Sequence, residues 1–156
     1  MKNIHKLIIS IALCEGAGII GALFTVSAIP TWYAHLHKPP FSPPNWIFGP
    51  VWTTLYLLMG ISLYLVWKKG LKKDKIRFAF IFFLAHLAIN AIWSVIFFGF
   101  QNIALAFLDI LILLGMIVYL IKIFYPINKA SAWLLAPYLL WVSFATILNL
   151  SLLILN

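Results

Sequence analysis

The chain has 156 residues, of which 65% are apolar and 9% charged, with a mean hydropathy of +1.08. Soluble domains average roughly 45–50% apolar and 25% charged residues, so this composition excludes an ordinary soluble fold. Eleven Lys and Arg residues against three acids give a net charge of +8. Because the basic residues lie between apolar segments, we interpret them as topology signals and expect no nucleic-acid partner. The single cysteine, Cys14, excludes an internal disulfide and favours inert packing.

Five segments have the length and hydropathy of membrane-spanning helices, each with the roughly 20 apolar residues that cross about 30 Å of hydrocarbon. Their expected bounds are about 7–29, 47–67, 77–99, 103–124 and 132–154. Apolar residues follow one another without the alternation that a membrane β-barrel requires. The sequence therefore predicts an all-α integral membrane protein, a five-transmembrane-helix bundle that forms a single membrane domain over residues 1–156. In the first segment, length and Glu15 favour a retained helix over a cleaved signal peptide.

The basic residues predict an orientation. Ten of them lie on the side that a five-helix chain gives to its N-terminus and to the second–third and fourth–fifth connections, and Lys38 alone lies on the other side. By the positive-inside rule, we expect a cytoplasmic N-terminus and an outside C-terminus, in a plasma membrane of the bacterial type. We interpret the cluster from Lys68 to Arg77 as a topology anchor, with an anionic-lipid site as the alternative.

The first connection differs from the short turns between the later helices. From Pro30 to Pro50 it holds six of the eight prolines, together with Trp32, Tyr33 and Trp46. Proline lowers the conformational entropy of such a loop, and the aromatic rings give it surface to bury. We therefore expect residues 30–46 to fold back as a lid over one end of the bundle.

Aromatic and polar side chains share faces on three of the expected helices. The helical spacing groups them as Trp52 and Tyr56 on the second, Asn90, Trp93 and Ser94 on the third, and Trp141, Ala145, Leu148 and Asn149 on the fifth. Polar residues within a membrane usually face the bundle interior or a cavity, so these faces predict a ligand pocket. The alternative is helix packing, with amides bonded across helices and indoles at the membrane interface.

Isolated polar groups in the spans carry weaker signals. Glu15 and Asp109 are expected to be neutral, paired or interior, and structural hydrogen bonding is favoured over a proton relay. His86 is more consistent with a helix contact than with an axial haem ligand, since no second ligand lies nearby. No metal site, cofactor requirement or catalytic constellation is expected. Small residues at Ala12-xxx-Gly16 and Ala17-xxx-Gly21 allow close helix approach, either within the chain or in a homodimer.

Several long motifs are similar to those of a known family. Trp32-Tyr33 is followed by KPPFSPPNWIFGPVWTTLYLLMG, then by NAIWSVIFF, Asp109 and PYLLWVSFATILN. Together these motifs resemble the tryptophan-rich sensory protein family, also called the translocator protein or peripheral-type benzodiazepine receptor family, over essentially the whole chain. The tail LNLSLLILN lacks the Tyr and the following Lys or Arg of the cholesterol-recognition pattern in animal members.

The resemblance implies a fold and a function. It implies a five-helix bundle, often dimeric, whose first loop closes a pocket for porphyrins, haem-related tetrapyrroles and benzodiazepine-type drugs. The implied ligand-binding residues are Trp32, Tyr33, Pro43, Trp46, Trp52, Tyr56, Asn90, Trp93, Trp141, Ala145 and Leu148. The main expectation is a receptor or transporter. One alternative is light-dependent oxidative degradation of protoporphyrin, in which Trp52 and Trp141 would be the catalytic residues. Another is a membrane assembly or stress factor.

Overall fold

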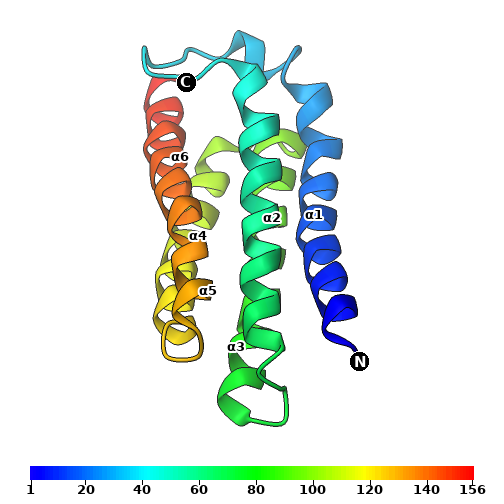
Figure 1. Ribbon diagram of the computed structural model, residues 1–156. Helices are drawn as coiled ribbons and strands as arrows, with labels where there is room; N and C mark the ends of the chain where they lie inside the picture. The colour runs from blue at the N-terminus through cyan, green and yellow to red at the C-terminus, as the bar shows by residue number, and fades with distance from the viewer.

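The computed structural model describes residues 1–156, and it consists of helices and their connections. Five helical spans are long and apolar enough to cross a membrane, which confirms the predicted all-α bundle of five transmembrane helices. Figure 1 shows these spans side by side, with the two chain termini at opposite ends. The helices are α1 (Asn3–Ala28), α2 (Phe48–Trp67), α3 (Asp74–Ser94), α4 (Ile103–Phe124), α5 (Lys129–Leu134) and α6 (Ala136–Leu155).

Two asparagines define where helices begin after the short turns. The side chain of Asn102 accepts a hydrogen bond of 2.9 Å from the backbone N–H of Leu105 at the start of α4. Asn128 does the same for Ser131 at the start of α5, at 3.1 Å. Each cap satisfies one of the N–H groups that a helix leaves unpaired at its N-terminus. The two caps therefore stabilise the first turns of α4 and α5.

The last span is not the single helix expected over residues 132–154. It is divided at Leu135 into α5 and α6, and Pro137 lies in the first turn of α6. Proline has no N–H to donate to the carbonyl of Trp133, four residues earlier, so the regular helical ladder cannot pass through this point. At the other end of the chain, α1 starts at Asn3, because helical hydrogen bonding continues into the polar flank beyond the apolar stretch.

Small residues allow close packing of α1 against its neighbours. A Cβ atom on Gly60 of α2 would lie 2.7 Å from the Cα atom of Ile11, and one on Gly21 would lie 2.9 Å from the Oγ of Ser94. Such short distances mean that Gly60 packs directly against the backbone of α1 at Ile11, and that Gly21 packs directly against the side chain of Ser94. A Cβ on Gly16 would meet nothing within 4 Å. Of the two small-residue pairs in α1, the one that includes Gly21 therefore packs within the chain.

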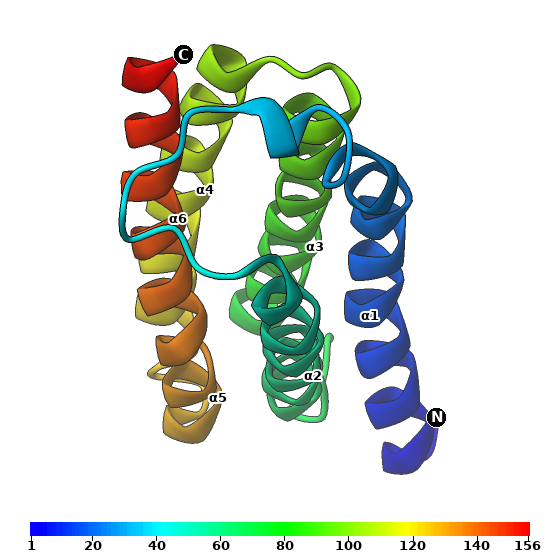
Figure 2. The same ribbon diagram turned by 90° about the horizontal axis from the view of Figure 1, so that it is seen from above.

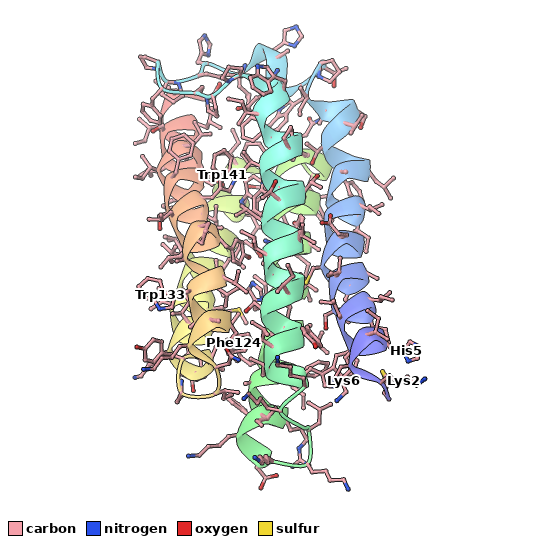
Figure 3. The ribbon with its side chains drawn as sticks, viewed as in Figure 1. Lys2, His5, Lys6, Phe124, Trp133 and Trp141 are labelled. Atoms are coloured by element: carbon pink, nitrogen blue, oxygen red, sulfur yellow. The ribbon has the colours of Figure 1, made fainter.

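Positive charge is concentrated at the end of the bundle opposite the lid. Figure 3 places Lys2 and Lys6 beside the N-terminus, and Figure 1 shows the α2–α3 and α4–α5 connections at the same end. The indole of Trp133 points away from the bundle near this end and is 69% exposed. This is the arrangement expected of an aromatic residue in the interfacial belt of a membrane protein.

Candidate ligand-binding cavity

A cavity of about 410 Å³ lies inside the half of the bundle nearer the lid, and we call it the main cavity. Its walls come from α1, α2, α3, α4 and α6. Its volume falls within the roughly 300–1,000 Å³ typical of sites for small molecules. Its aromatic and polar lining residues are Glu15, Thr25, Asn45, Trp46, Phe48, Trp52, Thr53, Tyr56, Asn90, Trp93 and Ser94.

The main cavity opens sideways, between α1 and α2. Its exposed lining residues all belong to these two helices or to the turn that leads into α2, and they include Ile19, Val26 and Thr53. Its inner wall is buried, with Tyr56 and Asn90 nearly inaccessible. Both helices are long and apolar enough to span a membrane, so we expect the part of the mouth that lies between them to face lipid.

Aromatic rings line the main cavity at two heights. Trp52 stacks on Tyr56, one turn further along α2, with ring centroids 5.4 Å apart. On α3, Trp93 stacks on Phe97 at 4.9 Å and donates its indole N–H to Asn149 of α6 at 3.1 Å. Packing and hydrogen bonds thus hold flat apolar surfaces in fixed orientations, which lowers the cost of ordering them when a ligand binds.

A second, smaller cavity of about 60 Å³ lies directly beneath the lid, and we call it the small cavity. It is lined by Tyr33 of the lid and by residues of α1, α3 and α6, among them Leu148. Trp93 and Ala145 line both cavities, so only their side chains and those of a few neighbours separate the two spaces. A ligand that displaced these side chains would reach the underside of the lid.

The lid lies against α3 and α6 rather than across the mouth. Seen from above in Figure 2, it leaves α1, passes over the end of α3, reaches α6 and returns to α2. Trp32 packs edge-on against Phe97 with centroids 5.4 Å apart, and Tyr33 lies 6.3 Å from the same ring. Phe41 contacts Phe144 of α6 at 6.3 Å. The rings of Trp32, Tyr33 and Phe41 therefore attach the lid to the bundle, whereas Trp46 is 73% exposed.

The far end of α6 also holds the lid. The side-chain amide of Asn156 accepts a hydrogen bond from the backbone N–H of His37 at 2.9 Å and donates one to its carbonyl at 3.0 Å. Lys38, next in the chain, places its ammonium group 4.7 Å from the ring centroid of Tyr33. Burial raises the pKa of the Tyr33 hydroxyl, so the ring that Lys38 contacts stays neutral at ordinary pH. The hydrogen bonds of Asn156 therefore hold the lid to the end of α6, in addition to the contacts between aromatic rings.

A chain of four buried side chains supports the inner wall of the main cavity. His86 uses Nδ1 toward the Phe83 carbonyl at 3.0 Å, which makes its Nε2 the acceptor for the hydroxyl of Tyr138 at 2.9 Å. Tyr138 in turn accepts a hydrogen bond of 2.8 Å from the amide of Asn90, whose oxygen accepts one from Tyr56. Both nitrogens of His86 are thus engaged within the bundle, and the residue lines neither cavity.

Comparison with known proteins shows which family the sequence belongs to. The sequence profile described as the TspO/MBR family matches residues 10–155. The chain belongs to the TspO/MBR family. It is 44% identical to the tryptophan-rich protein TspO of Archaeoglobus fulgidus over 154 residues, 99% of each chain. It is 39% identical to the human translocator protein over 131 residues, which cover 83% of this chain and 78% of the human one. With TspO of Chlorobaculum tepidum, the identity is 39% over 99% of this chain and 98% of the relative.

In this TspO/MBR protein, the residues that the sequence assigned to ligand binding fall into three groups. The main cavity is lined by Trp46, Trp52, Tyr56, Asn90, Trp93 and Ala145. Tyr33 and Leu148 line the small cavity only. Trp32, Pro43 and Trp141 line neither cavity. Trp141 points into the bundle from α6 (Figure 3) and packs edge-on against Phe48, a lining residue of the main cavity, with ring centroids 6.1 Å apart.

The contribution of α1 to the site was missed in the sequence. This helix supplies seven lining residues of the main cavity, among them Glu15, Gly18 and Thr25. α1 carries no stripe of aromatic and polar residues like those on α2, α3 and α6, and its small residues predicted only close helix packing. A Cβ atom on Gly18 would lie 2.6 Å from the ring of Tyr56, so this glycine makes room for a cavity wall. The sequence did offer one signal that α1 contributes to the site: an isolated acidic residue, Glu15, followed by several glycines in an apolar span.

The Asn156 contacts lead to a prediction about the lid of this TspO/MBR protein. Replacing Asn156 by alanine removes both hydrogen bonds to His37, so the lid should separate from the end of α6 more often. We expect hydrogen exchange at the backbone N–H of Leu36, which donates to the Tyr33 carbonyl within the lid, to become about fivefold faster, since two exposed hydrogen bonds are worth about 1 kcal/mol together. Hydrogen-exchange NMR would measure this rate, with Ser27→Ala as the control because its hydroxyl bonds only its own helix. An unchanged rate would contradict a role for this contact in the lid.

Proposed function

We propose that this protein is a membrane receptor or transporter-like protein that binds porphyrins and related tetrapyrroles in the main cavity. The observation that carries the proposal is a cavity of about 410 Å³, lined mostly by hydrophobic residues, with aromatic rings along its inner wall and a mouth between two helices that are apolar enough to span a membrane. Flat, lipid-soluble macrocycles match both the rings and the route of entry. Benzodiazepine-type drugs, which are smaller, flat and apolar, fit the same description.

The geometry favours binding over oxidative degradation as the primary function. Degradation driven by light needs an oxidisable indole against the macrocycle. Trp52 lines the main cavity, whereas Trp141 does not and instead packs against Phe48. Only one of the two indoles expected to take part therefore lines the proposed binding site. Binding requires only the cavity, and we give it precedence.

Filling the main cavity tests the proposal. Ala145 lies on the inner wall, so a phenylalanine there would project into the space that the ligand needs. We expect Ala145→Phe to weaken protoporphyrin binding at least tenfold, about 1.4 kcal/mol, in a titration of tryptophan fluorescence quenching. The matched control is Ala104→Phe, which adds the same ring on the exposed face of α4. Equal affinities in parent and Ala145→Phe would exclude the main cavity as the binding site.

Orientation in the membrane follows from charge. Ten of the eleven basic residues lie at the end with the N-terminus, and Lys38 lies in the lid. We therefore expect a cytoplasmic N-terminus, with the lid and the C-terminus outside. A C-terminal alkaline phosphatase fusion should be active and a C-terminal green fluorescent protein fusion dark. The reverse result would mean that the lid faces the cytoplasm.

A further inference from the structure

Several of the hydrogen-bond donors that line the main cavity are engaged within the protein. Thr25 donates to the Gly21 carbonyl and Thr53 to the Gly49 carbonyl, both at 2.9 Å, while Tyr56 donates to Asn90 and Trp93 to Asn149. The oxygens of these hydroxyls keep lone pairs that can still accept. The hydroxyl of Tyr56 can therefore accept a hydrogen bond from a ligand but has no proton left to donate to it.

Glu15 adds a carboxyl group to this wall. It is the deepest lining residue on α1, close to the middle of the span and at the opposite end of the cavity from the lid. None of the eleven Lys and Arg residues lines the cavity. Glu15 forms neither an ion pair nor a side-chain hydrogen bond, and the chain's one ion pair joins Asp74 and Arg77 at the surface. A carboxylate without a partner at this depth is costly unless a ligand or a proton compensates it.

The ring of Tyr56 lies beside this part of α1, since a Cβ atom on Gly18, one turn from Glu15, would lie 2.6 Å from that ring. Trp52 stacks on Tyr56 and lines the cavity on the same helix, and Trp93 lines it on α3. The faces of such rings carry partial negative charge and attract cations, more strongly when water is excluded. An aromatic cavity with a single carboxyl group and no basic residue is the arrangement that recognises a protonated amine or another N–H donor.

We propose that the deep end of the main cavity binds the N–H donor or protonated amine of a lipophilic ligand, with the carboxylate of Glu15 as the acceptor. This inference rests on the proposed ligand-binding function of the same cavity. It also gives the ligand a direction. An anionic group would be repelled by Glu15, so the carboxylates of a tetrapyrrole lie toward the lid and its nitrogens toward the deep end.

Three fluorescent probes of nearly equal size test the inference in nanodiscs of zwitterionic lipid, after subtraction of binding to empty nanodiscs. They are 9-(methylaminomethyl)anthracene, a cation, 9-(methoxymethyl)anthracene, which is neutral, and 9-anthraceneacetic acid, an anion. We expect the parent protein to bind the amine at least tenfold more tightly than the ether, and the ether more tightly than the acid. This order needs no variant, so it tests the inference even if a substitution at Glu15 impairs folding. Equal affinities for the three probes would overturn it.

Substitution of Glu15 assigns the preference to one residue. In Glu15→Gln, we expect the amine to bind at least tenfold more weakly and the ether to change less than twofold. Asp109→Asn is the matched control, since Asp109 is a membrane-span acid that lines neither cavity, and it should keep the parent ratio. A preference that survives Glu15→Gln, or is lost in Asp109→Asn, would overturn the inference. Protoporphyrin titration of the parent separates the two proposals: without protoporphyrin binding the tetrapyrrole function fails, whereas binding without an amine preference overturns this inference alone.

Discussion

Replacing Gly60 by alanine should destabilise the bundle by about 2 kcal/mol, a roughly 30-fold change in the ratio of folded to unfolded protein. The added Cβ would lie 2.7 Å from the Cα atom of Ile11 and 3.1 Å from its backbone nitrogen. Backbone atoms have no alternative rotamer, so α1 itself must move away from α2. Overpacking of this kind costs up to about 3 kcal/mol, and the better helix propensity of alanine returns about 1 kcal/mol.

Gly16 provides the matched control for this prediction. It lies in the interior of α1, and a Cβ there would meet nothing within 4 Å. Gly16→Ala should therefore be neutral or stabilising by up to about 1 kcal/mol. Reversible unfolding in mixed micelles with increasing SDS would compare the two variants. If both have the same stability, α1 and α2 do not touch at Gly60 in the membrane.

Removal of the Tyr138 hydroxyl should have the second large effect on stability. In Tyr138→Phe, the Nε2 of His86 and the amide of Asn90 each lose their partner in a fully buried site. An orphaned buried polar group costs about 1–3 kcal/mol in soluble proteins and less within membranes, so we expect a loss of about 2 kcal/mol for the pair. The same unfolding assay would measure it.

Comparing the stability of variants at the end and in the middle of the hydrogen-bond chain is a sharper test of this network. Tyr56→Phe removes one end of the chain and leaves only the oxygen of Asn90 unpaired, so it should cost about half as much as Tyr138→Phe. Tyr119→Phe removes an exposed hydroxyl from α4 and should leave stability unchanged. A Tyr56 variant less stable than the Tyr138 variant would mean that the network does not pass through Tyr138.

Hydropathy was sufficient to predict the five spans of the fold, because a chain segment that crosses lipid must be both apolar and helical. The helical faces predicted from spacing do bring Tyr56, Asn90 and Trp93 to one cavity. The break at Pro137 was missed because hydropathy is blind to a lost backbone donor. The effect of a proline near the start of a helix can be predicted only by asking which backbone hydrogen bond its missing N–H removes.

The rest of the site depends on packing that spacing does not encode. Trp141 and Ala145 lie one turn apart on α6, yet only Ala145 lines the main cavity. The ring of Phe48, the first residue of α2, packs against Trp141 and itself lines the cavity. Which of two residues on one helical face reaches a cavity is decided by side chains from other segments. The sequence pattern of a single helix therefore identifies the face but not the contact.

The sideways mouth of the main cavity changes what binding means energetically. A cavity open to the bilayer is filled by acyl chains when no ligand is present, so association exchanges one apolar occupant for another. Lipid tails are as apolar as leucine. Most of the favourable free energy of removing the ligand's apolar surface from water is therefore released when the ligand enters the membrane, before it binds the protein. Selectivity must then come from rigidity, ring stacking and polar contacts. Affinities for such a protein are meaningful as mole fractions in the membrane rather than as concentrations in water.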